Sequence, residues 1–223
     1  VLGTDNVCTS PEDLDRYSRC TIPWQSRCAA VVFPGSTDEV VSVVRIASRH
    51  RIAVWPSSKG RNWGYGTTLA IEDGAIVMIL ERMNRILEVN EELAYAVIEP
   101  GVTYEQFNAY LRSNGFKLWV DCTDGSAQGS VMGNAIERGV GETPYGDHFG
   151  NLCGLEVVLP DGDLVHVGGT RKGLKTWHTH KWGVGPYLEG IFTQSNLGIV
   201  TQAGIWLMPK PESYNSFVYE VRD

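Results

Sequence analysis

The chain has 223 residues, of which 43% are hydrophobic and 20% charged, and its formal net charge is −7 at pH 7. This composition is typical of a globular protein with one or two compact lobes. The acidic balance and the lack of a basic cluster argue against nucleic acid as a partner, and no apolar run approaches the ~20 residues that span a bilayer. No signal peptide precedes Val1, so we expect a trimmed chain, and its location stays open with the cytoplasm favoured over the periplasm.

The cysteines do not form a recognisable ligand or redox motif. There are five of them, Cys8, Cys20, Cys28, Cys122 and Cys153, and no two have the C-x-x-C spacing. We expect buried cysteines that act as small hydrophobic side chains, with a disulfide among the first three left open. We expect no metal site, because no second histidine or acidic ligand stands near His148 at a suitable spacing.

Strand and helix signals alternate in the first half of the chain. Residues 29–33 form a short apolar run, and Ser36 with Glu39 then has the spacing of a capping box at the start of a helix. The next apolar run, residues 52–55, completes a predicted βαβ unit. Further strands are predicted over residues 75–80, 85–90 and 95–99.

A second helix is predicted to begin at Thr103, with Gln106 at the capping-box position, and to end before Gly115. The glycine-rich stretch that follows, residues 121–150, has a length that usually indicates function or disorder inside a compact domain.

The last third of the chain predicts a hairpin, a loop and a closing strand. Residues 155–159 and 164–167 read as two strands joined by the tight turn Pro160-Asp161-Gly162-Asp163. Residues 170–180, which include His178 and His180, are polar and basic and are predicted to form a solvated surface loop. Residues 198–208 predict the closing strand.

The loop from Pro56 to Gly66 follows a predicted buried strand and combines three glycines with Lys59 and Arg61. Such a loop can be an ordinary glycine-rich connection, or it can present several backbone N–H groups to the diphosphate of a nucleotide. The spacing G-x-G-x-x-G of dinucleotide-binding folds is absent, as is the G-K-[ST] of phosphate-binding loops. A nucleotide would therefore be bound in another way.

Several runs stand in an order that is characteristic of one family. They are WPSSKGRN and GYG (55–62, 64–66), MNRILEVN (83–90), EPGVTY (99–104), GSVMGN (129–134), ERGVG (137–141), TPYGDH (143–148), GLEVVL (154–159), FTQSN (192–196), GIV (198–200) and WLMP (206–209). On these runs the sequence resembles the vanillyl-alcohol oxidase and p-cresol methylhydroxylase flavoproteins from about Val32 to Pro211.

The resemblance implies an α+β fold built as an FAD-binding domain of the p-cresol methylhydroxylase type. That domain would occupy residues 26–211, with FAD held between sub-lobes of about 26–115 and 116–211. Residues 1–25 would form an N-terminal segment. Residues 212–223 would begin the linker to a substrate cap domain that is absent from this chain.

The resemblance also implies which residues bind FAD, with the diphosphate on the loop and the flavin and adenosine ends flanked by the later glycine-rich segments. These residues are Pro56, Ser57, Ser58, Lys59, Gly60, Arg61, Asn62, Trp63, Gly129, Ser130, Gly133, Asn134, Gly139, Gly141, Tyr145, Gly146, His148, Gly198, Ile199 and Val200. The glycines would let the backbone approach a flat ligand, although glycines that serve only turns give the same pattern. We expect non-covalent FAD, because the segment Tyr17–Cys20 holds no histidine.

Two catalytic residues are implied, and a third position departs from the family. Asp124 matches an aspartate near flavin N5, although an aspartate before glycine also suits a turn or a cap. Tyr65 matches a tyrosine that holds the substrate as a phenolate, although it can equally be a packing aromatic. Glu142 stands where the phenol oxidases carry a tyrosine. It either faces elsewhere, or is protonated, or indicates a substrate other than a simple para-alkylphenol.

The resemblance therefore implies an FAD-dependent oxidoreductase that oxidises a para-substituted phenol or a related aromatic alcohol by hydride transfer to flavin N5. Its partners would be the small aromatic substrate, oxygen or a cytochrome as electron acceptor, and the cap domain, with homo-oligomerisation left open. The alternative is a non-catalytic flavin-binding fragment or assembly module that lacks its substrate domain.

Overall fold

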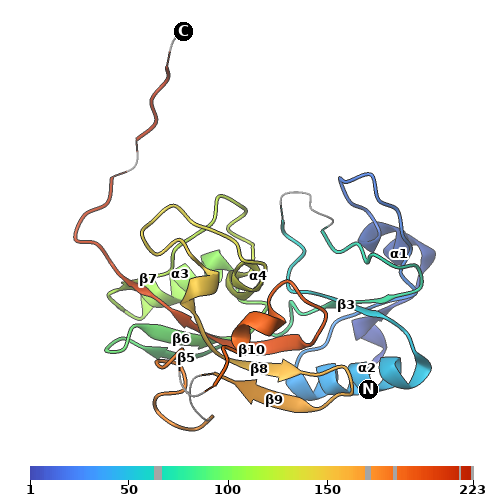
Figure 1. Ribbon diagram of the computed structural model, residues 1–223. Coiled ribbons are helices and arrows are strands. Elements are labelled where there is room, and N and C mark those ends of the chain that lie inside the picture. The colour runs from blue at the N-terminus through green and yellow to red at the C-terminus, as the bar shows by residue number, and fades with distance from the viewer. Residues whose placement is uncertain (63–66, 169–171, 183–184, 216, 222–223) are drawn as a thin grey trace.

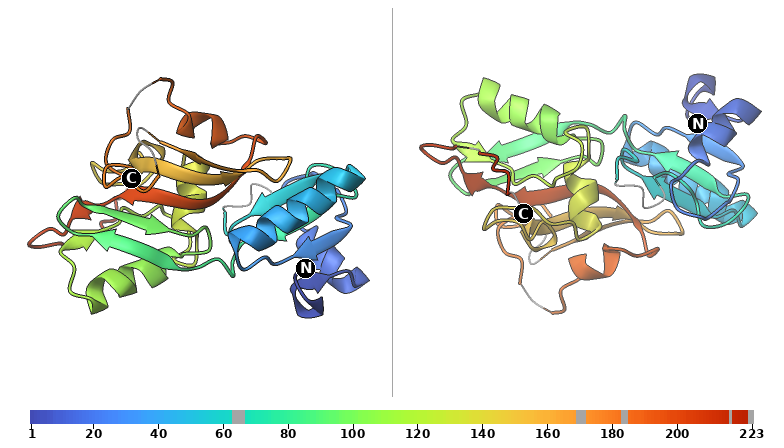
Figure 2. Two further views of the ribbon diagram at one scale, coloured as in Figure 1. Left: turned by 90° about the horizontal axis from the view of Figure 1, so that it is seen from below. Right: turned by 90° about the horizontal axis from the view of Figure 1, so that it is seen from above.

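The computed structural model describes residues 1–62, 67–168, 172–182, 185–215 and 217–221, and its architecture is α+β, as predicted. Two β-sheets lie side by side, and helices pack on both of them (Figures 1 and 2). With η marking a 3-10 helix, the helices are η1 (Thr4–Asn6), α1 (Pro11–Tyr17), α2 (Thr37–His50), α3 (Tyr104–Ser113), α4 (Val131–Ile136), η2 (Phe149–Asn151) and η3 (Glu189–Phe192).

The first sheet contains the predicted βαβ unit. Its strand order is β1 (Val7–Cys8), β2 (Ala30–Val32), β4 (Ile76–Ile79) and β3 (Val54–Ser57). Helix α2 connects β2 to β3, and β4 lies between these two strands and parallel to both. The unit is therefore confirmed, with one later strand inserted at its centre.

Helix α2 forms where the capping box and the apolar period predict it. The hydroxyl of Ser36 accepts a hydrogen bond from the Glu39 amide, and the Glu39 carboxylate accepts one from the amide of Gly35. The helix buries Val40, Val43, Val44 and Ala47. These valines join a core cluster that also contains Val158 and Ile199 of the second sheet, so one hydrophobic core connects the two sheets.

The second sheet is antiparallel throughout. Its order is β5 (Ile86–Asn90), β6 (Tyr95–Ile98), β10 (Ile199–Trp206), β8 (Leu152–Val158) and β9 (Leu164–Val167), and a separate small ladder joins β7 (Leu118–Trp119) to β11 (Met208–Pro209). Helices α3 and α4 lie on one face of this sheet (Figure 1) and share its main core cluster.

The chain changes sheets well before residue 115, where we predicted the division into sub-lobes. Strands β5 and β6 precede residue 115 but belong to the second sheet, where β5 pairs with β6 and β6 pairs with β10, so the chain passes from one sheet to the other between Ile79 and Ile86. Strand pairing of this kind is set by contacts between distant residues, which local sequence patterns do not reveal.

The connection between the sheets is closely packed. The amide of Gly101 donates to Met83 O at 2.7 Å, and a Cβ atom at Gly101 would lie 2.7 to 2.8 Å from three carbonyl oxygens of residues 80–83. Beside it, the buried carboxylate of Glu99 accepts hydrogen bonds from the Arg85 amide and guanidinium. A residue larger than glycine would therefore separate the two sheets at this point.

Two further expectations are corrected. His178 does not lie in a solvated loop: it is 8% exposed, and its Nδ1 lies 2.8 Å from Cys153 O, because the adjacent Trp177 is buried and draws the segment onto the sheet. Burial lowers the pKa of His178, whereas His180 is exposed as predicted. Only Cys28 and Cys153 are buried, Cys122 is exposed, and all five cysteines are free, so none forms the disulfide that was left open.

Within the described ranges, no helix has the length and apolar character needed to cross a bilayer.

Candidate functional site

A cavity of about 720 Å³ lies where the two sheets meet. Its walls come from three parts of the chain: the loop after β3, the segment from Pro100 to Glu142 that includes α4, and the segment from Phe192 to Val200 that leads into β10. A cavity of this volume, lined by three separate parts of the chain, suits an extended ligand of the size of a dinucleotide.

The loop after β3 offers donors to an anion. The backbone N–H groups of Lys59, Gly60 and Arg61 have no protein acceptor in the part of the chain that the structure describes. Gly60 has a φ of 61°, and a Cβ atom there would lie 2.5 Å from Thr68 Cγ2. Glycine is thus required for this turn, and the turn leaves three consecutive donors for a phosphate group.

The N-terminal segment holds the end of this loop. Thr67 Oγ1 donates a hydrogen bond of 2.9 Å to Arg19 O, and Thr68 Oγ1 donates one of 3.0 Å to Tyr17 O. The Lys59 ammonium lies 3.5 Å from the Glu81 carboxylate. The loop is therefore positioned by contacts outside the cavity.

Helix α4 packs closely against the same loop. Ser130 Oγ accepts a hydrogen bond from the Gly133 amide at 2.8 Å and donates one of 2.6 Å to Pro100 O. A Cβ atom at Gly133 would overlap Ser58 Oγ. This helix, which the sequence patterns did not predict, brings its first turn and the loop together around the cavity.

Most of the predicted cofactor residues meet at this cavity. Those that line it are Pro56, Ser57, Ser58, Lys59, Gly60, Arg61, Asn62, Gly129, Ser130, Gly133, Asn134, Gly139, Gly198, Ile199 and Val200. Gly141, Tyr145, Gly146 and His148 are not among its lining residues. Trp63 and Tyr65 lie outside the described residues.

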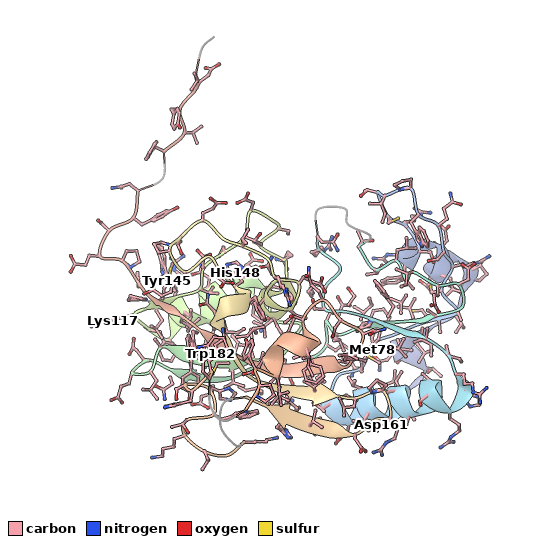
Figure 3. The ribbon with its side chains drawn as sticks, in the orientation of Figure 1. Met78, Lys117, Tyr145, His148, Asp161 and Trp182 are labelled. Carbon is pink, nitrogen blue, oxygen red and sulfur yellow. The ribbon has the colours of Figure 1, made fainter. Side chains whose placement is uncertain are left out.

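His148, which is labelled in Figure 3, belongs to a buried polar group that contacts Asn134 of the cavity lining. His148 Nε2 lies 2.7 Å from Asp121 Oδ2, and His148 Nδ1 contacts Asn134 Oδ1. The imidazole is 6% exposed and the Asp121 side chain 3%. The sequence patterns gave no signal for Asp121, which is 27 residues from His148 in the chain.

Three acidic residues are among those that line the cavity: Asp124, Glu137 and Glu142. Tyr104 also lines the cavity, and burial, with Cys122 and Asp121 adding to it, raises the pKa of its phenol above the ordinary value. Tyr104 stands in the run EPGVTY, which could have indicated its place.

The comparisons with known proteins agree with this geometry. The model of the family described as "FAD binding domain" matches residues 28–168. The chain is 45% identical to 1'-carboxy-chondrochloren decarboxylase of Chondromyces crocatus, over 100% of this chain and 41% of the relative. It is 40% identical to the 4-cresol dehydrogenase [hydroxylating] flavoprotein subunit of Pseudomonas putida, over 97% of this chain and 42% of the relative.

A solved structure of p-cresol methylhydroxylase with substrate bound superposes with a TM-score of 0.91 at 41% identity, covering 95% of this chain and 42% of that one. The chain therefore spans about two fifths of the length of the relatives it matches. Three features fit the FAD that such a domain binds. They are the close packing at Gly60 and Gly133, which we call the glycine cradle, the N–H groups of Lys59, Gly60 and Arg61, and the volume of the cavity.

Proposed function

This chain belongs to the FAD binding domain family and has the fold of p-cresol methylhydroxylase, and from this premise we propose that its residues 26–211 form the FAD-binding part of an enzyme that oxidises para-substituted phenols or related aromatic alcohols. The observation that carries the proposal is that Asp124 lines the same cavity as the glycine cradle for FAD. The similarity to the 4-cresol dehydrogenase flavoprotein subunit supports this substrate class.

The residues of the cavity have separable tasks in this proposal. The N–H groups of Lys59, Gly60 and Arg61 bind the diphosphate, and Gly129 and Gly133 allow the backbone to approach the rest of the cofactor. When bound, FAD supplies a two-electron acceptor for the hydride that leaves the benzylic carbon, which is attached to the ring para to the phenolic oxygen. Oxygen or a cytochrome then serves as the final electron acceptor.

Asp124 is proposed as the catalytic carboxylate. As the substrate loses a hydride, positive charge develops on its benzylic carbon, and a carboxylate close to that carbon stabilises the charge. Tyr65 is proposed to hold the phenolic oxygen, although its position lies outside the described residues. A hydroxyl donor at that oxygen favours the phenolate, from which hydride loss is easier.

Glu142 limits which chemical groups the proposed substrate can carry. A carboxylate in the cavity wall repels a phenolate and favours a neutral or cationic group beside it. We therefore propose that the substrate carries such a group, or that the phenol is bound away from Glu142.

A second candidate is decarboxylation, and the 45% identity to 1'-carboxy-chondrochloren decarboxylase favours it. In the reaction that we propose as this candidate, a carboxylated aromatic substrate would lose its carboxyl group as carbon dioxide and give up two electrons to the bound cofactor. Release of carbon dioxide from a carboxylated aromatic substrate, in step with flavin reduction, separates this candidate from simple oxidation.

The test uses the complete protein. Purified protein should show the absorption band of bound flavin, and 4-cresol, vanillyl alcohol or eugenol should bleach it in the absence of oxygen. Flavin that no aromatic substrate bleaches would favour the alternative of a non-catalytic flavin-binding module. Protein without affinity for FAD would overturn both.

A further inference from the structure

The side chain of Asn134 belongs both to the cavity and to the buried group behind it. Asn134 is a lining residue of the cavity, and its Oδ1 contacts His148 Nδ1. On the far side of the imidazole, His148 Nε2 lies 2.7 Å from Asp121 Oδ2. The three side chains thus form one chain of hydrogen bonds that ends at the cavity surface.

The atoms at each end of this chain define the hydrogen bond to Asn134. An amide oxygen only accepts hydrogen bonds, so Nδ1 of His148 donates to Asn134 Oδ1. On the other side of the ring, Nε2 contacts Asp121 in a site where both side chains are almost fully buried. The second oxygen of Asp121 accepts a hydrogen bond from the Thr143 amide at 3.3 Å, which holds the carboxylate in place.

This orientation leaves the amide nitrogen of Asn134 available. With Oδ1 directed to His148, the two N–H groups on Nδ2 have no acceptor among the residues that the structure describes. A polar group at the wall of a binding site that lacks a protein partner is expected to bind the ligand or water. FAD carries acceptors along its whole length, on its phosphates, hydroxyls and ring carbonyls.

Two glycines, Gly139 and Gly141, lie against the side chains of Asn134, Asp121 and His148. A Cβ atom at Gly139 would overlap the Asn134 carboxamide, and one at Gly141 would overlap Asp121 Oδ2 and lie 2.7 Å from His148 Nε2. Neither glycine has a positive φ, so the need for glycine at both positions comes from the side chains of the network. Residues 139 and 141 therefore pack directly against the side chains of the network.

We propose that Asp121 and His148 are positioning residues that fix Asn134 with its amide nitrogen toward bound FAD. The inference rests on FAD occupying the cavity but not on the identity of the substrate. His148 itself does not touch the cofactor in this arrangement and acts through Asn134.

The first test measures FAD affinity by titrating the apoprotein of the complete protein and following flavin fluorescence. Asn134→Asp keeps the acceptor for His148 but removes the donors, and we expect about tenfold weaker FAD binding, as for the loss of one hydrogen bond. His148→Gln and Asp121→Asn should weaken binding to a similar extent, because each releases the amide of Asn134. His180→Gln alters an exposed histidine outside the network and should bind FAD as the wild type does.

Wild-type affinity in His148→Gln and Asp121→Asn, together with a loss in Asn134→Asp, would overturn the positioning role. Wild-type protein that binds no FAD would instead overturn the proposed function.

The second test uses the wild-type protein and so does not depend on whether a variant folds. In the FAD-loaded wild-type protein labelled with ¹⁵N-histidine, nuclear magnetic resonance should show a proton on Nδ1 of His148, the nitrogen that contacts Asn134 Oδ1. A signal from an unprotonated Nδ1 of His148 would overturn the inference, because the carboxamide would then have to present its oxygen to the cavity.

Discussion

Thr37, the first residue of α2, donates a hydrogen bond of 2.9 Å to the buried carboxylate of Glu156 in β8, and so connects a helix of the first sheet to a strand of the second. The same carboxylate accepts hydrogen bonds from Thr201 of β10, at 3.0 Å, and from Lys172, at 3.1 Å, and it lies 3.0 Å from His166 Nε2. This buried carboxylate therefore joins the two sheets at whose junction the cavity lies.

Glu156→Gln should make the protein less stable at neutral pH. Burial alone would raise the pKa of Glu156, but hydrogen bonds from His166, Thr37, Lys172 and Thr201 together hold it below its ordinary value of 4.5. The charged carboxylate thus contributes stability above about pH 4.5, and this contribution is lost as the pH falls through the folded-state pKa.

We expect the substitution to lower the free energy of unfolding by roughly 1–3 kcal/mol at pH 7. The difference from the wild type should shrink as the pH falls below 4.5, as measured by urea unfolding. Glu92→Gln, at an exposed glutamate, is the matched control. A difference that stays constant with pH would contradict this explanation.

Gly60→Val should prevent retention of FAD. Valine at a φ of 61° is strained, and its Cβ would collide with Thr68 Cγ2, so the three N–H donors of the loop would move apart. Gly74→Val is a suitable control, because Gly74 also has a positive φ, 77°, but has no atom within 4 Å of the added Cβ. FAD content after gel filtration is the measurement, and equal content in both variants would place the diphosphate elsewhere.

Lys59→Ala should weaken FAD binding much less than Gly60→Val. The Lys59 ammonium already lies 3.5 Å from Glu81, and a partly exposed charge contributes about 1 kcal/mol or less. Isothermal titration of the apoprotein with FAD measures the difference. A loss as large as that of Gly60→Val would show that charge, rather than the backbone, holds the diphosphate.

Gly133→Ala should weaken FAD binding, and Ser58→Ala should partly restore it. The new methyl group overlaps Ser58 Oγ and would push the loop away from α4. When Ser58 lacks its hydroxyl, the nearest remaining atoms belong to Ser130, at 3.1 to 3.2 Å, a contact that small shifts can relieve. If the double variant binds no better than Gly133→Ala, the overlap is not the cause of the loss.

Asp124→Ala should slow flavin reduction far more than it weakens substrate binding. We expect a loss of at least about 100-fold in the reduction rate, with a dissociation constant that changes little, because the carboxylate acts mainly in the transition state. Stopped-flow absorbance of the complete enzyme without oxygen gives both quantities. Equal changes in rate and affinity would remove Asp124 from the catalytic role.

Glu142→Tyr tests the substrate class. The substitution restores the tyrosine that the resemblance leads one to expect and removes a carboxylate from the cavity wall. If it creates or improves oxidation of 4-cresol, the natural substrate differs from a simple para-alkylphenol. Reduced activity on 4-cresol would instead indicate that Glu142 already serves a phenol.

Capping residues and apolar periods in the sequence predicted helices α2 and α3. Ser36 and Thr103 cap α2 and α3 as expected, each accepting a hydrogen bond from the amide three residues later. Gly115, with a φ of 73°, follows the end of α3 as predicted. Helix α4 was missed because it has only 6 residues and contains a glycine, too little for an apolar period.

The remaining features depend on contacts between distant residues. The presence of β5 and β6 in the second sheet, the burial of His178 against Cys153 and the pairing of His148 with Asp121 leave no periodic trace in the sequence. The candidate cofactor residues were predicted from the order of the motifs rather than from spacing. Most of them line one cavity, but the place of His148 outside that lining was not predicted.

The central place of β10 in the second sheet has a consequence for folding during synthesis. Strand β6 lies about a hundred residues before β10, yet the two pair directly, and Ile199 and Val200 of β10 line the cavity. The first sheet can assemble once residue 79 has left the ribosome, whereas the second must wait for residue 206. Until then β6 and β8 each expose the edge that β10 covers in the folded protein, and unpaired edges of this kind favour aggregation.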